Sequence, residues 1–232
     1  MNLLILESRL LGKDIWRVVV VSIILSFINM LIYAKNGVVN PNISSSEVLI
    51  TLFGSVQNYP MNWIYWIVFC VGYVILLQVI WKPRIHMFSV NQLLRHKNIK
   101  RFWGIKFLTG FIFTCFYAFC SMVLTFIFCL LAGTPIIFDP VWLLVYLCLI
   151  INLYLHSLLW LLVKLYSMAE MANFSILALF YVGVKLNYPI SLLYFGMFSN
   201  LNNISVALLV EFAAAVFICM IIIKKAKKMD YL

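Results

Sequence analysis

Long apolar runs, each about the length needed to cross a bilayer, constrain the fold of this chain more than any other feature. A membrane-spanning helix needs about 20 mostly apolar residues to cross about 30 Å of hydrocarbon. Hydrophobic residues make up 66% of the sequence and charged residues only 10%, which is outside the range of soluble domains. The pattern predicts a single-domain, all-α, polytopic membrane protein with six transmembrane helices, at residues 16–34, 63–81, 107–132, 141–165, 168–186 and 205–223.

Lysine and arginine placement predicts the orientation of these spans, because basic residues next to a span are retained in the cytoplasm. With the N-terminus inside, all of the 17 basic residues except Lys35 and Lys185 fall on the cytoplasmic side. We therefore expect both termini to be cytoplasmic. The basic residues that give the net charge of +10 lie beside spans and not in a soluble basic domain. This placement favours contact with anionic lipid, and we expect no nucleic-acid partner.

Three further segments are expected to lie at the membrane surface. Residues 1–15 mix leucines with charges and predict an interfacial helix that leads into the first span. Residues 46–53 predict a short surface helix in the first outer loop. Pro189 would break a helix that continued beyond the fifth span, so residues 188–198 are interpreted as a re-entrant or interfacial segment.

A basic stretch without acidic residues, 82–106, separates the second and third spans and predicts a cytoplasmic coupling loop. Within it, Ser89 to Gln92 fit a capping box, and Val90, Leu93 and Leu94 would form one apolar edge of a short helix. The alternative is a basic loop that lies on lipid. The candidate docking helix comprises Phe88, Ser89, Val90, Asn91, Gln92, Leu93, Leu94, Arg95, His96 and Lys97.

Polar side chains inside a span are costly and are therefore functional candidates. Glu211 could face a cavity, a cationic substrate or a basic partner, or it could be a residue that snorkels or is hydrogen-bonded at a helix interface. Asn152 and His156 share one face of the fourth span and are expected to bond across helices and not to bind a metal, and Asn29 is similar. The H-E-x-x-H, G-x-S-x-G and P-loop patterns are absent, so we expect no catalytic residues and no bound cofactor in this chain.

The expected order of elements resembles the permease subunit of an ABC-2-type (type V) ABC transporter. That order is an interfacial helix, six spans, a cytoplasmic helix between the second and third spans, and a broken apolar segment before the sixth. The resemblance implies that residues 88–97 dock into a cytoplasmic ABC ATPase subunit, which would bind the ATP and Mg²⁺. It also implies a second permease copy or a sister permease as a partner. Residues 188–198 would dip back into the membrane from outside.

These features lead to two expectations of function. The first is an ATP-driven exporter subunit in a bacterial cytoplasmic membrane, with an amphipathic or hydrophobic cargo such as an antimicrobial or toxin-like peptide, or a role in immunity to such a peptide. The second is a standalone multi-pass membrane protein that binds a peptide or regulates a membrane sensor without an ATPase. A partner that binds nucleotide would distinguish them.

Overall fold

The described part of the chain is entirely helical. The computed structural model describes residues 3–81, 99–137, 139–189, 191–200 and 203–226, and the expected docking helix, 88–97, lies outside these ranges. The described residues form eight α-helices and one short 3₁₀ helix. Their bounds are α1 Leu3–Lys35, α2 Ser45–Leu52, α3 Asn62–Ile80, α5 Ile99–Leu131, α6 Val141–Tyr166, α7 Ala169–Leu186, α8 Leu192–Gly196, η1 Phe198–Asn200 and α9 Ile204–Ala226.

Four of these helices are long and apolar enough to cross a membrane, namely α5, α6, α7 and α9. Two shorter apolar stretches, Val19–Lys35 in α1 and Asn62–Gln78 in α3, run alongside them. Large apolar side chains such as Phe174, Leu209 and Phe217 are exposed on the outer surface of the bundle. A soluble monomer rarely exposes so much apolar surface, whereas lipid covers it without cost. The helix lengths and this surface together indicate a membrane protein.

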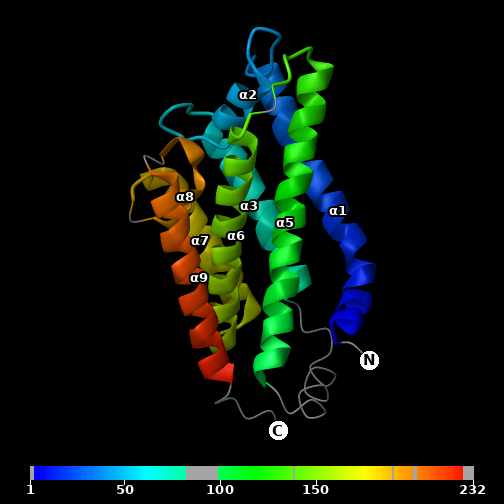
Figure 1. Cartoon of the computed structure of the whole chain (residues 1–232), viewed down its shortest axis with the longest axis vertical. Helices are drawn as coiled ribbons and strands as arrows, with labels where there is room; N and C mark the ends of the chain where they lie inside the picture. The colour runs from blue at the N-terminus through cyan, green and yellow to red at the C-terminus, as the bar shows by residue number, and fades with distance from the viewer. Residues whose placement is uncertain (1–2, 82–98, 138, 190, 201–202, 227–232) are drawn as a thin grey trace.

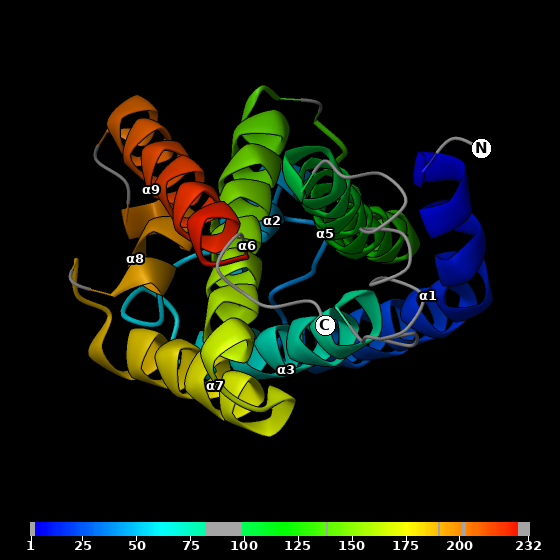
Figure 2. The same ribbon diagram turned by 90° about the horizontal axis from the view of Figure 1, so that it is seen from below.

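Helix α6 occupies the centre of the bundle. Figure 2 shows α9, α7, α3 and α5 arranged around it, and α1 packs against α3 and α5 on the far side. In the most apolar part of α6, 56% of the residues are buried, against 28% in α7 and in α9. Polar side chains on α6 therefore face protein, while much of α7 and α9 faces outward.

The bundle has two unlike ends. The C-terminal end of α3, the start of α5 and the end of α9 lie together at one end, which we call the terminal end (Figure 1). Helix α2 and the connection between α5 and α6 lie at the opposite end, which we call the α2 end, and α8 lies in the same half of the bundle, further from that end than α2. Lys100, Lys164 and Lys224 belong to the terminal end, whereas Lys35 and Lys185 belong to the α2 end.

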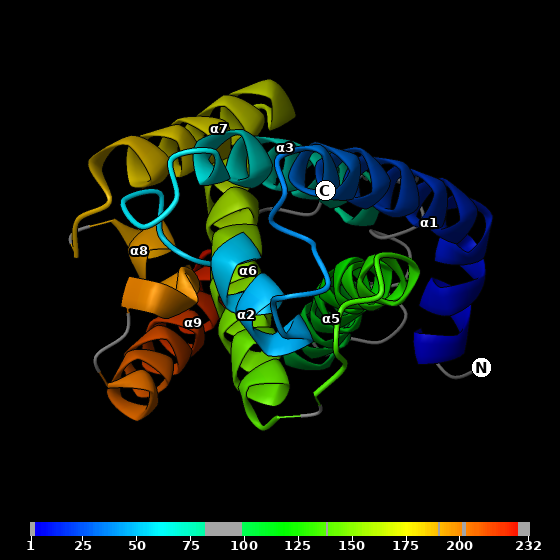
Figure 3. The ribbon, with the colours of Figure 1, turned by 90° about the horizontal axis from the view of Figure 1, so that it is seen from above.

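The short helix expected at residues 46–53 is present as α2, and one face of it packs onto the bundle. Seen from above, it lies across the top of α6 (Figure 3), and it contacts both α5 and α6. Leu49, Leu52 and the adjacent Phe53 have no exposed surface. Its start is well defined, because Ser44 accepts a hydrogen bond from the Glu47 amide while the Glu47 carboxylate accepts one from the Ser44 amide.

Aromatic side chains form the core beneath α2. Phe53 makes edge contacts with Tyr65, Trp66 and Phe69, and the ring of Tyr33 from α1 meets Tyr65 at a centroid distance of 5.3 Å. Tilted and T-shaped ring pairs of this kind add to the energy of apolar burial. Tyr65 and Trp66 are therefore fully enclosed by protein.

Two helices extend beyond the predicted spans. Helix α1 is continuous from the region expected to be interfacial into the region expected to span, and α5 begins eight residues before the expected start at residue 107. The segment expected to be re-entrant or interfacial, 188–198, contains α8, and η1 begins at its last residue. It begins after Asn187, whose left-handed backbone conformation (φ 42°) ends α7.

Candidate functional site

The structure brings two of the predicted intramembrane residues into direct contact. Asn152 on α6 and Glu211 on α9 are 1% and 2% exposed, and the Asn152 side-chain amide donates a hydrogen bond of 2.5 Å to the Glu211 carboxylate. The sequence predicted each residue as a candidate but did not pair them. We call Asn152 and Glu211 the intramembrane pair. Of the two expectations for Glu211, the structure favours hydrogen bonding at a helix interface over exposure to a cavity.

Asn152 also holds the short helix α8. The second hydrogen of its side-chain amide is donated to the Leu192 carbonyl oxygen at 2.7 Å. A single amide therefore joins three elements, because α6 supplies it, α9 supplies the carboxylate and α8 supplies the carbonyl. Any displacement of α8 relative to α9 must stretch or break one of these two bonds.

Gly196 allows α8 to approach α6 closely enough for this contact. A Cβ atom at position 196 would lie 2.7 Å from both Cγ and Oδ1 of Asn152, which is closer than real side-chain contacts. Gly183 on α7 has the same role on the other side, since a Cβ there would lie 2.7 Å from the Leu193 Cβ. Two glycines thus allow α8 to fit between α6 and α7.

The intramembrane pair is incompletely satisfied. Within the described residues, the Glu211 Oε2 atom is buried and has no hydrogen-bond partner. An unpaired carboxylate oxygen in an apolar environment is costly. Such an oxygen can accept a hydrogen bond from a substrate or from another helix, or it can bind a cation. This makes Glu211 the strongest candidate in the described residues for a functional group inside the membrane.

His156 lies close in sequence to this pair but makes different contacts. Its Nδ1 atom lies 2.8 Å from the Asn152 carbonyl oxygen, one turn back on the same helix, so Nδ1 carries the proton and donates it. Its ring stacks on Phe180 of α7 at a centroid distance of 4.4 Å. The expected hydrogen bond across helices is therefore made by Asn152 but not by His156. Nε2 of His156 is buried without a partner in the described part of the chain.

Asn29 does not belong to this site. It lies on α1, and its side-chain nitrogen is 3.5 Å from the Tyr65 carbonyl oxygen of α3, at the limit of a hydrogen bond. Across the residues that the structure describes, no group of three or more histidine, cysteine or acidic side chains is arranged to hold a metal ion.

Sequence reasoning missed a second polar cluster, at the α2 end. We call Ser55, Asn62, Asn187, Ser199 and Asn200 the α2-end network. Asn187 donates to the Ser55 hydroxyl at 2.5 Å, and Asn200 donates to the Asn187 carbonyl oxygen at 2.8 Å. The Ser55 backbone N–H donates to the Ser199 hydroxyl at 2.6 Å. These bonds join the ends of α7 and η1 to the loop after α2.

Asn62 supports the loop in this network from below. Its side-chain amide donates to the carbonyl oxygens of Thr51, Gly54 and Ser55, and its own oxygen accepts from the Tyr33 hydroxyl. The Phe198 N–H also donates to the Phe53 carbonyl oxygen at 3.0 Å. The sequence signal for this network was Asn187, which directly follows the apolar helix α7. Asparagine tolerates the left-handed conformation, and its side chain bonds to nearby backbone.

The chain matches no protein-family model, no curated protein and no solved structure. Its function is therefore argued from its own residues.

Proposed function

We propose that this chain is the membrane-spanning permease subunit of an ATP-driven ABC transporter of the ABC-2 type. In this proposal, α1, α3, α5, α6, α7 and α9 are six spans, and both termini are cytoplasmic. ATP and Mg²⁺ bind to a separate ATPase subunit. The cargo is an amphipathic or hydrophobic molecule such as an antimicrobial or toxin-like peptide, exported or excluded for immunity.

One observation carries this proposal, namely the broken segment between α7 and α9. Helices α8 and η1 lie in the half of the bundle nearer the α2 end and are too short to cross a bilayer, and α8 reaches α6 through the bond from Asn152 to the Leu192 carbonyl oxygen. A segment that enters from one surface and returns to it fits the expected re-entrant element of these permeases. Non-helical backbone at membrane depth requires burial in protein, and the contacts of α8 with α6 and α7 supply it.

The distribution of charge supports the orientation in this proposal. Helices α5, α6 and α9 carry lysines at the terminal end, while Lys35 and Lys185 are the only lysines or arginines among the described residues of the α2 end. Basic residues are retained on the cytoplasmic side. The terminal end is then cytoplasmic, and the connection between α3 and α5 faces the ATPase subunit.

Co-purification with nucleotide-binding protein tests the proposal. The tagged chain, extracted from its own host in mild detergent, should carry a partner with ATPase activity and a P-loop sequence. Replacing Leu93 and Leu94 with glutamate should remove that partner, because two charges would disrupt the expected apolar edge. Asn91→Glu with Gln92→Glu is the matched control, since it adds the same charge away from that edge and keeps the capping box.

One result would contradict the assigned docking helix, and another would contradict the permease proposal as a whole. An ATPase that stays bound to the Leu93→Glu/Leu94→Glu variant would show that the docking helix is wrongly assigned. A wild-type chain that carries no nucleotide-binding protein, although its export or immunity phenotype is intact, would favour the standalone membrane protein instead.

A further inference from the structure

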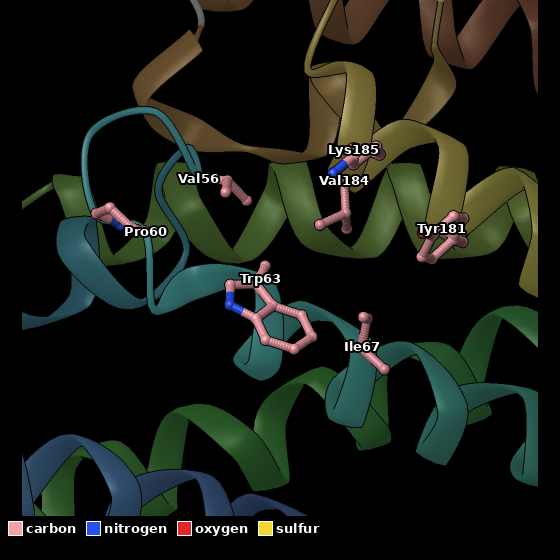
Figure 4. Close-up of a pocket in the computed structure, with 7 residues that line it drawn as sticks. All are labelled: Val56, Pro60, Trp63, Ile67, Tyr181, Val184 and Lys185. Carbon is pink, nitrogen blue, oxygen red and sulfur yellow. The ribbon is translucent and has the colours of Figure 1, made fainter.

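A cavity between α3 and α7 opens at the α2 end of the bundle. Its volume is about 440 Å³, within the range of small-ligand sites. Figure 4 shows that α3 and the loop before it form one wall and α7 forms the other. The lining residues are Val56, Pro60, Trp63, Ile67, Tyr181, Val184 and Lys185.

The chemistry of this wall is apolar with one cation. Lys185 is the only charged residue among the seven, and no carboxylate accompanies it. No ion pair with Lys185 is found within the described residues. Trp63 and Tyr181 are 50% and 58% exposed, so both rings are available to a molecule in the groove. A ligand that complements this wall has an apolar body and a negative charge.

The apolar lining and the Lys185 charge lie at different depths along the groove. Helix α3 begins at the α2 end and α7 finishes there, so Ile67 lies about one turn deeper in the bundle than Trp63, and Tyr181 lies about one turn deeper than Lys185. A molecule aligned with the helices would contact apolar side chains at its inner part and the ammonium group at its end. This is the arrangement of an acyl chain and its headgroup, with aromatic rings at the interface.

We propose that this groove is a binding site for an anionic phospholipid of the leaflet at the α2 end. The headgroup lies against Lys185, and one acyl chain lies along Trp63, Ile67 and Val184. The inference does not depend on the permease proposal, because it uses only the groove and its one charge.

A second copy of the chain fits the groove less well. A symmetric contact places the same surface of both copies in one interface, so it would enclose both Lys185 ammonium groups without a carboxylate in the cavity lining. Only about one turn of each helix lines the groove, whereas a helix that docks needs a longer contact surface. A lipid requires neither a long contact surface nor a matching carboxylate.

Quenching of Trp63 fluorescence by brominated lipids tests the site directly. The purified chain is reconstituted in bilayers that contain increasing fractions of brominated phosphatidylglycerol or brominated phosphatidylcholine. The Trp63 signal is the difference between wild type and Trp63→Phe. We expect half-quenching at an about fivefold lower fraction of the anionic lipid, which is the effect of one basic side chain on an anionic headgroup.

Lys185→Gln should make the two quenching curves coincide, because the headgroup charge then has no partner. Lys35→Gln is the matched control, since Lys35 is the other lysine of the α2 end and does not line the groove. It should leave the preference unchanged.

Three results would overturn the inference. One is an equal preference for the anionic lipid in wild type and Lys185→Gln, and another is an equal loss of preference in Lys35→Gln. The third is no quenching by either lipid together with cross-links between chains at Tyr181→Cys, which would assign the groove to a second copy.

Discussion

The two polar clusters of this molecule differ in how completely their hydrogen bonds are made. In the α2-end network, Asn62 uses its side-chain oxygen and both amide hydrogens, and Asn187 and Asn200 are joined in a chain to Ser55. In the intramembrane pair, Asn152 uses both of its amide hydrogens, but Glu211 has one carboxylate oxygen without a partner among the described residues.

This difference separates a structural cluster from a candidate functional one. A buried polar network whose groups are satisfied rigidifies its surroundings, and removing a member leaves several groups unpaired. A buried carboxylate with an unpaired oxygen lowers stability and keeps an acceptor for another donor. We therefore expect substitutions in the α2-end network to lower stability most, and substitution of Glu211 to change function without lowering stability.

The largest effect is expected for Asn62→Leu. This change leaves the carbonyl oxygens of Thr51, Gly54 and Ser55 without the amide donor and the Tyr33 hydroxyl without its acceptor. It should lower the free energy of unfolding in detergent by about 3 kcal/mol. Denaturant titration followed by tryptophan fluorescence measures it. Asn58→Ala, an exposed position in the same loop, is the control and should stay within about 0.5 kcal/mol of wild type. An equal loss in both variants would mean that the network is not the cause.

A smaller loss is expected for Gly196→Ala. The added Cβ would lie 2.7 Å from Asn152, so α8 must move away from α6 and the bond from Asn152 to the Leu192 carbonyl oxygen must lengthen. Overpacking of this kind costs about 1–3 kcal/mol. Gly104→Ala on α5 is the matched control, because nothing lies within 4 Å of its Cβ position and alanine favours a helix. Thermal unfolding should show a lower midpoint only for Gly196→Ala, and a normal midpoint would indicate that α8 packs loosely.

The intramembrane pair itself should contribute less. Asn152→Leu removes donors from Glu211 and from the Leu192 carbonyl oxygen, and interhelical bonds in membranes are worth about 0.6–1.7 kcal/mol. Asn152→Leu combined with Glu211→Leu should be more stable than Asn152→Leu alone, because the carboxylate is no longer left unpaired. The free energies of unfolding of Asn152→Leu, Glu211→Leu and the double variant measure this coupling. Additive losses would show that the two side chains do not interact.

The smallest effect on stability is expected for Glu211→Gln. Glutamine keeps the acceptor for Asn152 and removes a charge from an apolar environment, so the free energy of unfolding should change by less than about 0.5 kcal/mol. Under the permease proposal, export or immunity should nevertheless fall if the open oxygen binds a substrate or a partner helix. Unchanged transport and unchanged assembly in this variant would remove Glu211 from the functional candidates. Loss of folded protein would instead give the carboxylate a structural role.

Local patterns predicted much of the helical content. The expected segments 141–165, 168–186 and 205–223 lie within or close to α6, α7 and α9, because an unbroken apolar run bounded by charges or prolines is sufficient to define a long helix. The capping pattern at Ser44 and Glu47 was also readable, although its significance was missed. The predicted span began at residue 107, where the apolar run begins. The segment Ile99 to Lys106, which precedes that run, is also helical, so α5 begins earlier than predicted.

Burial was harder to predict than helix formation. Sequence periodicity does not reveal which face of an apolar helix meets protein and which meets lipid, since both are hydrophobic. The enclosure of Tyr65 and Trp66, and of Leu49 on α2, follows from neighbours that are distant in the chain. The same holds for the α2-end network, in which Ser55 and Asn187 are 132 residues apart.

The sequence by itself determined that this chain is helical and has helices long and apolar enough to cross a membrane, because composition and the length of apolar runs depend only on local order. It also marked Asn152 and Glu211, since a polar group in a long apolar run is conspicuous wherever it points. Only the tertiary structure decided that these two residues meet, that Gly196 allows α8 to reach them, and that Lys185 borders an apolar groove. Those facts depend on how helices pack side by side, and packing is set by distances between residues that the linear order does not contain.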